Sequence, residues 1–194
     1  MSRLAVFGYG SLVSRASVAE TLGHDAAPPV AARLAGWRRR WSLVRDNARA
    51  EKGFEPIAGE AFDHCLGLNL EPAPDADEDE WPNGALIELT EAELDRLDLR
   101  ELRYDRVEVT GDVRTDADFD TVFTYTAKPE NFAARPPPRS VVLASYLRAC
   151  EAAFEELGPN EVVTFALTTG PTPVPVIEAR LVRDEIPEGN PRAW

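Results

Sequence analysis

A glycine-bearing loop near the start of the chain is the first candidate for a binding site. Residues 8–11 read Gly-Tyr-Gly-Ser, directly after a short apolar run and shortly before a helix-forming segment. Glycines permit backbone conformations that bulkier residues do not adopt, and N–H groups at a turn or at the start of a helix bind anions or oxyanions. The loop is therefore a candidate cradle for an anionic group. A tight strand-to-helix turn that binds nothing explains the same residues equally well.

The loop lacks the two common phosphate-binding motifs, and metal-binding residue types are scarce. A dinucleotide fingerprint requires a third small residue where Val13 stands, and the Gly-Lys-Ser/Thr ending of a P-loop is absent. The only cysteines are Cys65 and Cys150, and the only histidines are His24 and His64. Neighbouring residues of a strand point to opposite faces, so His64 and Cys65 are poorly placed to share a metal ion. We expect no metal and no other cofactor.

The composition indicates a folded protein with a small-molecule partner. The chain has 194 residues, 44% of them hydrophobic, which suits a single globular domain over residues 1–194. Its formal net charge of −13 argues against nucleic acid, which is bound through Lys and Arg. The apolar stretch before the first glycines is too short for the core of a signal peptide, and no later run reaches membrane-spanning length. We expect a cytoplasmic protein with neither a nucleic-acid nor a membrane partner, and leave the oligomeric state open.

Short strands must position the loop. Buried or alternating apolar patterns predict strands at residues 4–7, 31–34, 40–44, within 58–73, at 83–90, at 104–114 with a turn at Thr110-Gly111, and at 120–128 as the partner of that last strand. The acidic, proline-rich segment between the strands within 58–73 and at 83–90 is predicted to be a solvated loop.

Three helices are predicted from their ends and their apolar spacing. A short helix after the loop ends at Gly23, and Thr90 with Glu93 forms a capping box for a helix that begins at residue 91. The clearest helix covers residues 141–157, with Ser140 as its cap and Gly158 at its end. Short strands and helices in mixed order predict an α+β fold around a small mixed or barrel-like sheet.

Four motifs resemble the gamma-glutamylcyclotransferase-like family, including its ChaC branch. They are VFGYGSL at residues 6–12, LAGWRRRW at 34–41, LDLRELRYDRVEV at 97–109 and FTYTAKPENF at 123–132. The likeness covers roughly residues 3–157, and its most specific parts are FGYGSL and the LDxxE element that ends at Glu101. It implies a small mixed β-barrel flanked by helices.

The resemblance also implies an activity and a set of site residues. The loop of Tyr9, Gly10, Ser11 and Leu12 would hold a gamma-glutamyl group, and Glu101 would be the catalytic acid/base. Such enzymes cyclise the gamma-glutamyl group to 5-oxoproline and release an amine. The substrate's own α-amine attacks, so no protein nucleophile is required, and no Ser/His/Asp or Cys/His arrangement is evident. One carboxylate beside both nitrogens can act first as base and then as acid.

Each of these residues has a purely structural interpretation as well. Glu101 would also suit a surface ion-pair network with Arg100, Arg103 or Arg106. Ser11 could serve only as a hydrogen-bonding residue at a helix start. Tyr9 and Tyr125 would suit either the core or substrate contact, with Tyr125 taken as a candidate substrate-binding residue.

Two further features bear on the substrate. The arginines between Trp37 and Trp41 most simply cover apolar surface with their stems, and the alternative is that one of them binds a substrate carboxylate. After Glu101, Leu102 and Arg103 stand where the glutathione-acting branch typically has glycines. A different pocket for the amine side follows, so glutathione is one candidate among gamma-glutamyl peptides and amines. The rival functions are a non-catalytic protein that binds a small acidic metabolite in the same cavity, and an interaction protein that uses the acidic loop.

Overall fold

The apolar run before the glycine loop forms a central strand that is buried on both faces. The structure is a computed structural model that describes residues 3–186 and 188–191. In it β1 (Leu4–Gly8) pairs antiparallel with β6 (Asn83–Leu89) and parallel with β9 (Thr121–Ala127). Ala5 and Phe7 belong to one hydrophobic cluster and Val6 to another. A strand covered on both sides reads as a continuous apolar run, which explains its lack of alternation.

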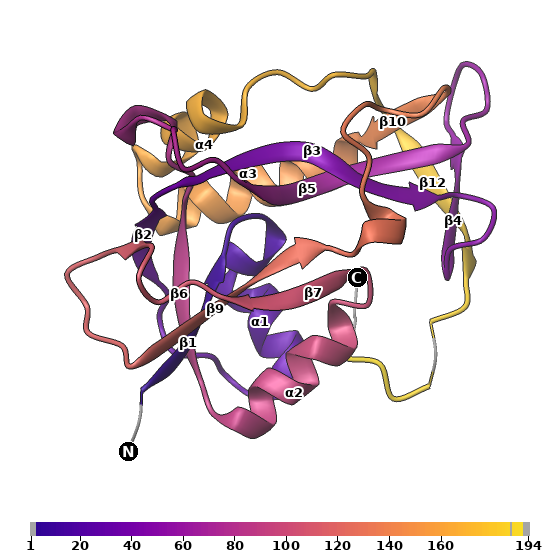
Figure 1. Ribbon diagram of the computed structural model, residues 1–194. Coiled ribbons are helices and arrows are strands. Elements are labelled where there is room, and N and C mark those ends of the chain that lie inside the picture. Colours follow the sequence, from indigo (N-terminus) through magenta and orange to yellow (C-terminus); the bar gives the residue numbers. More distant parts are fainter. Residues whose placement is uncertain (1–2, 187, 192–194) are drawn as a thin grey trace.

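The described strands form three sheets (Figure 1), and the two larger ones mix parallel and antiparallel pairs. The six-stranded sheet has the order β7 (Tyr104–Glu108), β9, β1, β6, β2 (Val30–Leu34) and β8 (Val113–Arg114). The four-stranded sheet has the order β11 (Val176–Ile177), β10 (Ser140–Leu143), β5 (His64–Pro72) and β3 (Trp37–Asp46). A two-stranded arm consists of β12 (Ala179–Asp184) and β4 (Lys52–Pro56).

Four α-helices in the described part of the chain cover these sheets. They are α1 (Arg15–Leu22), α2 (Glu91–Arg100), α3 (Ala144–Leu157) and α4 (Glu161–Thr169). Helices α1 and α2 pack with the Val6 side of β1, whereas α3 and α4 share a core with both larger sheets. Figure 1 shows α1 beside α2, and α3 behind β3 and β5. The predicted α+β class with a small mixed sheet flanked by helices is confirmed.

The local signals at helix ends were accurate for α1 and α2. Gly23 ends α1 in the left-handed region, with φ of 79°. The Oγ1 of Thr90 accepts a hydrogen bond from the Glu93 amide while the Glu93 carboxylate accepts from the Thr90 amide, so the predicted capping box is present. The predicted pairing of residues 120–128 with the strand that begins at residue 104 is also confirmed, as β9 and β7.

The start predicted for the longest helix was wrong. Ser140 does not cap a helix: residues 140–143 form β10, which pairs with β5 and β11, and the Ser140 hydroxyl donates to the Pro137 carbonyl. The error concerns a strand pairing between distant segments. The predicted turn at Thr110-Gly111 is present, and the short strand after it, β8, pairs with β2. None of the described helices has the length and apolar character needed to span a bilayer.

Candidate active site

The glycine loop leaves the C-terminal end of β1 and enters a short 3₁₀ helix at Ser11–Val13. The Val13 amide donates to the Gly10 carbonyl at 3.0 Å, and the Ser14 amide to the Ser11 carbonyl at 3.2 Å. Ser11 and Leu12 occupy the first two positions of this helix, where N–H groups have no acceptor within the helix. The sequence therefore builds a fixed turn here, and the Ser11 amide at its start lies against the Cys150 sulfur.

Gly10 lies where the loop backbone packs closely against neighbouring side chains. Its φ of −143° lies outside the left-handed region, which differs from the conformational freedom expected of this glycine. A Cβ at this position would lie 3.3 Å from the hydroxyl oxygen of Tyr146 and 3.4 Å from a methyl carbon of Leu68. The absence of a side chain lets the loop backbone approach α3 and β5.

The flanking loop residues are anchored in the core. Tyr9 is buried, and its hydroxyl donates to the Tyr125 carbonyl at 2.7 Å. Burial holds the pKa of Tyr9 well above its usual value, so the phenol stays neutral. Leu12 is also buried, in the cluster that includes α2. These contacts fix the loop from both sides.

Glu101 stands at the C-terminal end of α2, where the chain turns into β7. Its amide donates to the Leu97 carbonyl, and its Oε1 lies 3.2 Å from the Nε of Arg100. The Glu101 side chain is only 14% exposed. The Arg100 guanidinium is in turn held by Ser17 and Thr21 of α1. The carboxylate is therefore oriented by a partner that is itself fixed to a neighbouring helix.

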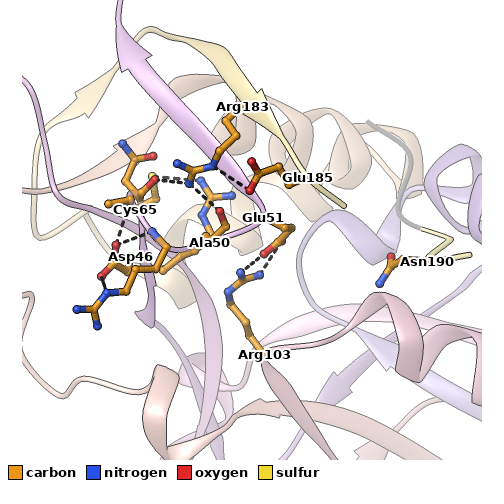
Figure 2. A network of polar contacts seen from close by, with 12 residues as sticks. Asp46, Ala50, Glu51, Cys65, Arg103, Arg183, Glu185 and Asn190 are labelled. Atoms are coloured by element: carbon orange, nitrogen blue, oxygen red, sulfur yellow. Dashed lines mark hydrogen bonds and ion pairs between the residues drawn. The ribbon is translucent and has the colours of Figure 1, made fainter. Parts of the chain in front are cut away.

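The other arginines near Glu101 have their own acidic partners. Arg103 forms an ion pair with Glu51 through two hydrogen bonds (Figure 2). Arg106 pairs with Asp98 at 3.0 Å. Glu101 thus pairs with Arg100, one of the three arginines considered from the sequence, but in a largely buried setting.

A cavity of about 160 Å³ brings Ser11 and Glu101 together. Among the described residues, the lining comes from six parts of the chain: Ser11, Leu43, Arg45, Lys52, Phe54, Cys65, Leu66, Gly67, Arg100, Glu101, Arg103, Tyr104, Leu143, Ser145 and Tyr146. Two residues that the sequence placed in one site, 90 positions apart, thus face the same space. The lining offers a carboxylate, several cations, and hydroxyl groups.

Three other predicted site residues, Tyr9, Gly10 and Leu12, support the loop without lining the cavity. Tyr125, the fourth, is 2% exposed and packs with α1 and α2, and its hydroxyl donates to Asp98 at 2.7 Å. Burial, followed by this bond to Asp98, raises the pKa of Tyr125. In this structure the Tyr125 side chain lies among core residues and does not line the cavity.

Neither cysteine has the properties of a nucleophile. Cys65 lines the cavity, yet burial raises the pKa of its thiol. Burial also raises the pKa of Cys150 to about 12. Both sulfurs stay protonated near neutral pH, and the thiolate is the reactive form. Within the described residues, no group of three or more His, Cys, Asp or Glu side chains is arranged to hold a metal ion.

Arg39, within the arginine run between Trp37 and Trp41, is buried as a whole and does not merely cover apolar surface with its stem. It is 1% exposed and lies against the rings of Phe154 and Phe165. Its guanidinium donates to oxygens of the loop, of β6 and of α4: the carbonyls of Tyr9, Asn83 and Phe165, the Asn83 side chain, and the hydroxyls of Thr168 and Thr169. Burial lowers the pKa of Arg39 to about 9, so it remains charged near neutral pH. Arg39 ties the loop to the helical layer behind it.

Replacing Arg39 with Met should lower the free energy of unfolding by about 2 kcal/mol or more, because buried acceptors on three elements lose a charged donor. Urea unfolding of the two proteins measures this difference. Arg40→Met, at the exposed neighbouring position, should change stability by no more than about 0.5 kcal/mol. Equal stability of the Arg39→Met variant and the parent would show that the buried network contributes nothing net.

Comparison with known proteins supports the fold. No family model and no curated protein sequence matches the chain. Among solved structures, a gamma-glutamyl cyclotransferase matches with a TM-score of 0.59 and 16% identity over 88% of this chain and 89% of that one. YkqA from Bacillus subtilis matches with a TM-score of 0.53 and 19% identity over 88% of this chain, which spans 57% of YkqA. A yeast gamma-glutamyl cyclotransferase specific to glutathione matches with a TM-score of 0.50 and 14% identity, over 86% of this chain and 97% of that one. The chain therefore has the gamma-glutamyl cyclotransferase fold, as the motifs predicted.

Proposed function

We propose that this protein is an enzyme of the gamma-glutamylcyclotransferase type. It cyclises a gamma-glutamyl peptide or amine to 5-oxoproline and releases the amine, with Glu101 as general acid/base. The observation that carries the proposal is the shared cavity of Glu101 and Ser11, in a chain with the cyclotransferase fold. The names of two neighbours, including one specific to glutathione, support the same reaction class.

The reaction needs one proton carrier. The α-amine of the gamma-glutamyl group attacks the gamma-carbonyl carbon, a new C–N bond closes the five-membered ring, and the original amide C–N bond breaks. The attacking nitrogen loses a proton and the departing nitrogen gains one. A single carboxylate within reach of both nitrogens performs the two transfers in turn. Glu101, held in place by Arg100, fits that role.

The loop supplies orientation. Ring closure requires the substrate to be folded, and fixing that conformation can contribute up to roughly 7 to 11 kcal/mol to lowering the barrier. Under this proposal, the amides at the start of the 3₁₀ helix bind either the α-carboxylate of the glutamyl group or the gamma-carbonyl oxygen. The anchored Tyr9 and Leu12 keep those amides in position.

The proposal is tested by incubating the purified protein with gamma-glutamyl amino acids, glutathione and a gamma-glutamyl alkylamine, and then measuring 5-oxoproline. A catalyst releases 5-oxoproline and amine in equal amounts. A non-catalytic binding protein would show a ligand-dependent rise in Tm without 5-oxoproline. That second result would contradict the proposed activity while keeping the cavity as a binding site.

A further inference from the structure

The cavity concentrates positive charge in a strongly acidic protein. Among the residues that the structure describes, the charged lining comprises four cations and one carboxylate, whereas the whole chain carries −13. Three of the cations face carboxylates: Arg100 lies 3.2 Å from Glu101, Lys52 lies 3.6 Å from Asp184, and Arg103 is bound to Glu51. The fourth cation, Arg45, has a different environment.

Arg45 lines the cavity from β3. In the parts of the chain that the structure describes, no Asp or Glu oxygen lies within 4.0 Å of its guanidinium. Its Nη2 contacts the sulfur of Cys65 at 3.3 Å, and its guanidinium carbon lies 4.8 Å from the centre of the Phe54 ring. Both neighbours also line the cavity, and Figure 2 shows Cys65 within this polar network.

These contacts position the guanidinium but leave its charge uncompensated. A guanidinium has five N–H donors, and a thiol sulfur is a weak acceptor that engages one of them. No nitrogen of Arg45 is both buried and without a hydrogen-bond partner. The N–H groups that do not contact Cys65 are therefore open to solvent or to a ligand in the cavity. Such a group is suited to bind a carboxylate through two parallel hydrogen bonds.

We infer that Arg45 binds a carboxylate on the amine side of the substrate, so that the preferred substrates are gamma-glutamyl amino acids or peptides with a free carboxylate. This inference rests on the proposed function, in which the loop amides and Glu101 hold the gamma-glutamyl half. A gamma-glutamyl polyamine would place its own positive charge among Arg45, Lys52 and Arg103. The basic lining therefore selects against cationic leaving groups.

The test compares two compounds that differ only in this carboxylate, gamma-glutamyl-L-alanine and gamma-glutamyl-L-alaninamide. The parent should prefer the acid by about 10- to 100-fold in kcat/KM, the range expected for a charge-assisted pair. Arg45→Met should remove most of that preference by slowing the acid and leaving the amide within a few fold. Arg45→Lys should restore part of it.

Arg38→Met is the matched control, because Arg38 is on the same strand, does not line the cavity and pairs with Glu80 outside it. It should keep the parent's preference. An Arg45→Met variant that loses activity equally on the acid and the amide would overturn the inference, since Arg45 would then act on the gamma-glutamyl half or on folding. Unchanged preference in that variant would overturn it as well.

Binding measurements separate this inference from the proposed reaction. Calorimetric titration of the Glu101→Gln variant, with and without Arg45→Met, measures the affinity for the same two compounds without turnover. A preference for the acid that depends on Arg45, together with no 5-oxoproline from the parent, would refute the reaction and retain the carboxylate site. Production of 5-oxoproline without such a preference would retain the reaction and refute the carboxylate site. Absence of both binding and turnover would refute both.

Discussion

The Glu101→Gln variant is expected to cyclise gamma-glutamyl compounds about 10²- to 10⁴-fold more slowly than the parent, with affinity unchanged within a few fold. Glutamine keeps the shape of the side chain and an oxygen that accepts from Arg100, but it does not take up the proton of the attacking amine. The two quantities are measured as the initial rate of 5-oxoproline release and as the Kd from calorimetry.

Two comparisons make this prediction specific to Glu101. Glu91→Gln removes an exposed carboxylate at the other end of α2, and should leave turnover unchanged. The Glu101→Gln variant should lose about 1 kcal/mol or less of its free energy of unfolding, because the hydrogen bond to Arg100 is retained. The shift in melting temperature measures this loss. Undiminished turnover would exclude Glu101 from the chemistry and leave it as the partner of Arg100 alone.

Gly10→Val should abolish detectable substrate binding while the protein still folds. The new Cβ would lie 3.3 Å from the Tyr146 hydroxyl, and the two added methyl groups need further space beside α3 and β5. Tyr146 lines the cavity, so the crowding displaces both the loop and a cavity wall. Calorimetry with a gamma-glutamyl compound and a thermal unfolding curve distinguish lost binding from lost structure.

Gly111→Val is the control for a glycine-to-valine change, because a Cβ at Gly111 meets no atom within 4 Å. It should bind substrate as the parent does. Ser11→Ala should have a milder effect than Gly10→Val, since the loop is proposed to bind through its backbone amides. A Gly10→Val protein with the parent's affinity would remove the loop from the binding site, and a severe loss in Ser11→Ala would shift the role to the hydroxyl.

Local signals in the sequence were sufficient for the elements that carry the site. Strand β1 was predictable from its apolar run, the end of α1 from Gly23, and the start of α2 from the capping box at Thr90. Each of these signals lies within a few residues of the element that it marks. Strand β10 was mistaken for the first turn of α3 because a short apolar run suits either structure, and its pairing with β5 involves residues more than 70 positions away. The arm of β4 and β12 is likewise a long-range pair.

The individual positions of Arg39 and Arg45 were not identified from the sequence. The arginines between Trp37 and Trp41 were expected to cover apolar surface with their stems or to supply one ligand for a substrate carboxylate. Instead the whole Arg39 side chain is buried with Trp37 and Trp41 on one side of β3. Their alternate spacing is the signal that would have placed Arg39 inward. No comparable signal marks Arg45, whose position in the cavity depends on the neighbouring strands β4 and β5. By contrast, Glu101 and Ser11 were found through the motif resemblance.

The central claim is that one substrate lies against both the glycine loop and Glu101, and a crystal structure of the Glu101→Gln variant with a bound gamma-glutamyl compound tests it most directly. The predicted result has the scissile amide nitrogen within hydrogen-bonding distance of the residue 101 side chain, and the glutamyl group against the amides of residues 10–12. A ligand bound outside the cavity, or one with its glutamyl group turned away from the loop, would contradict the claim.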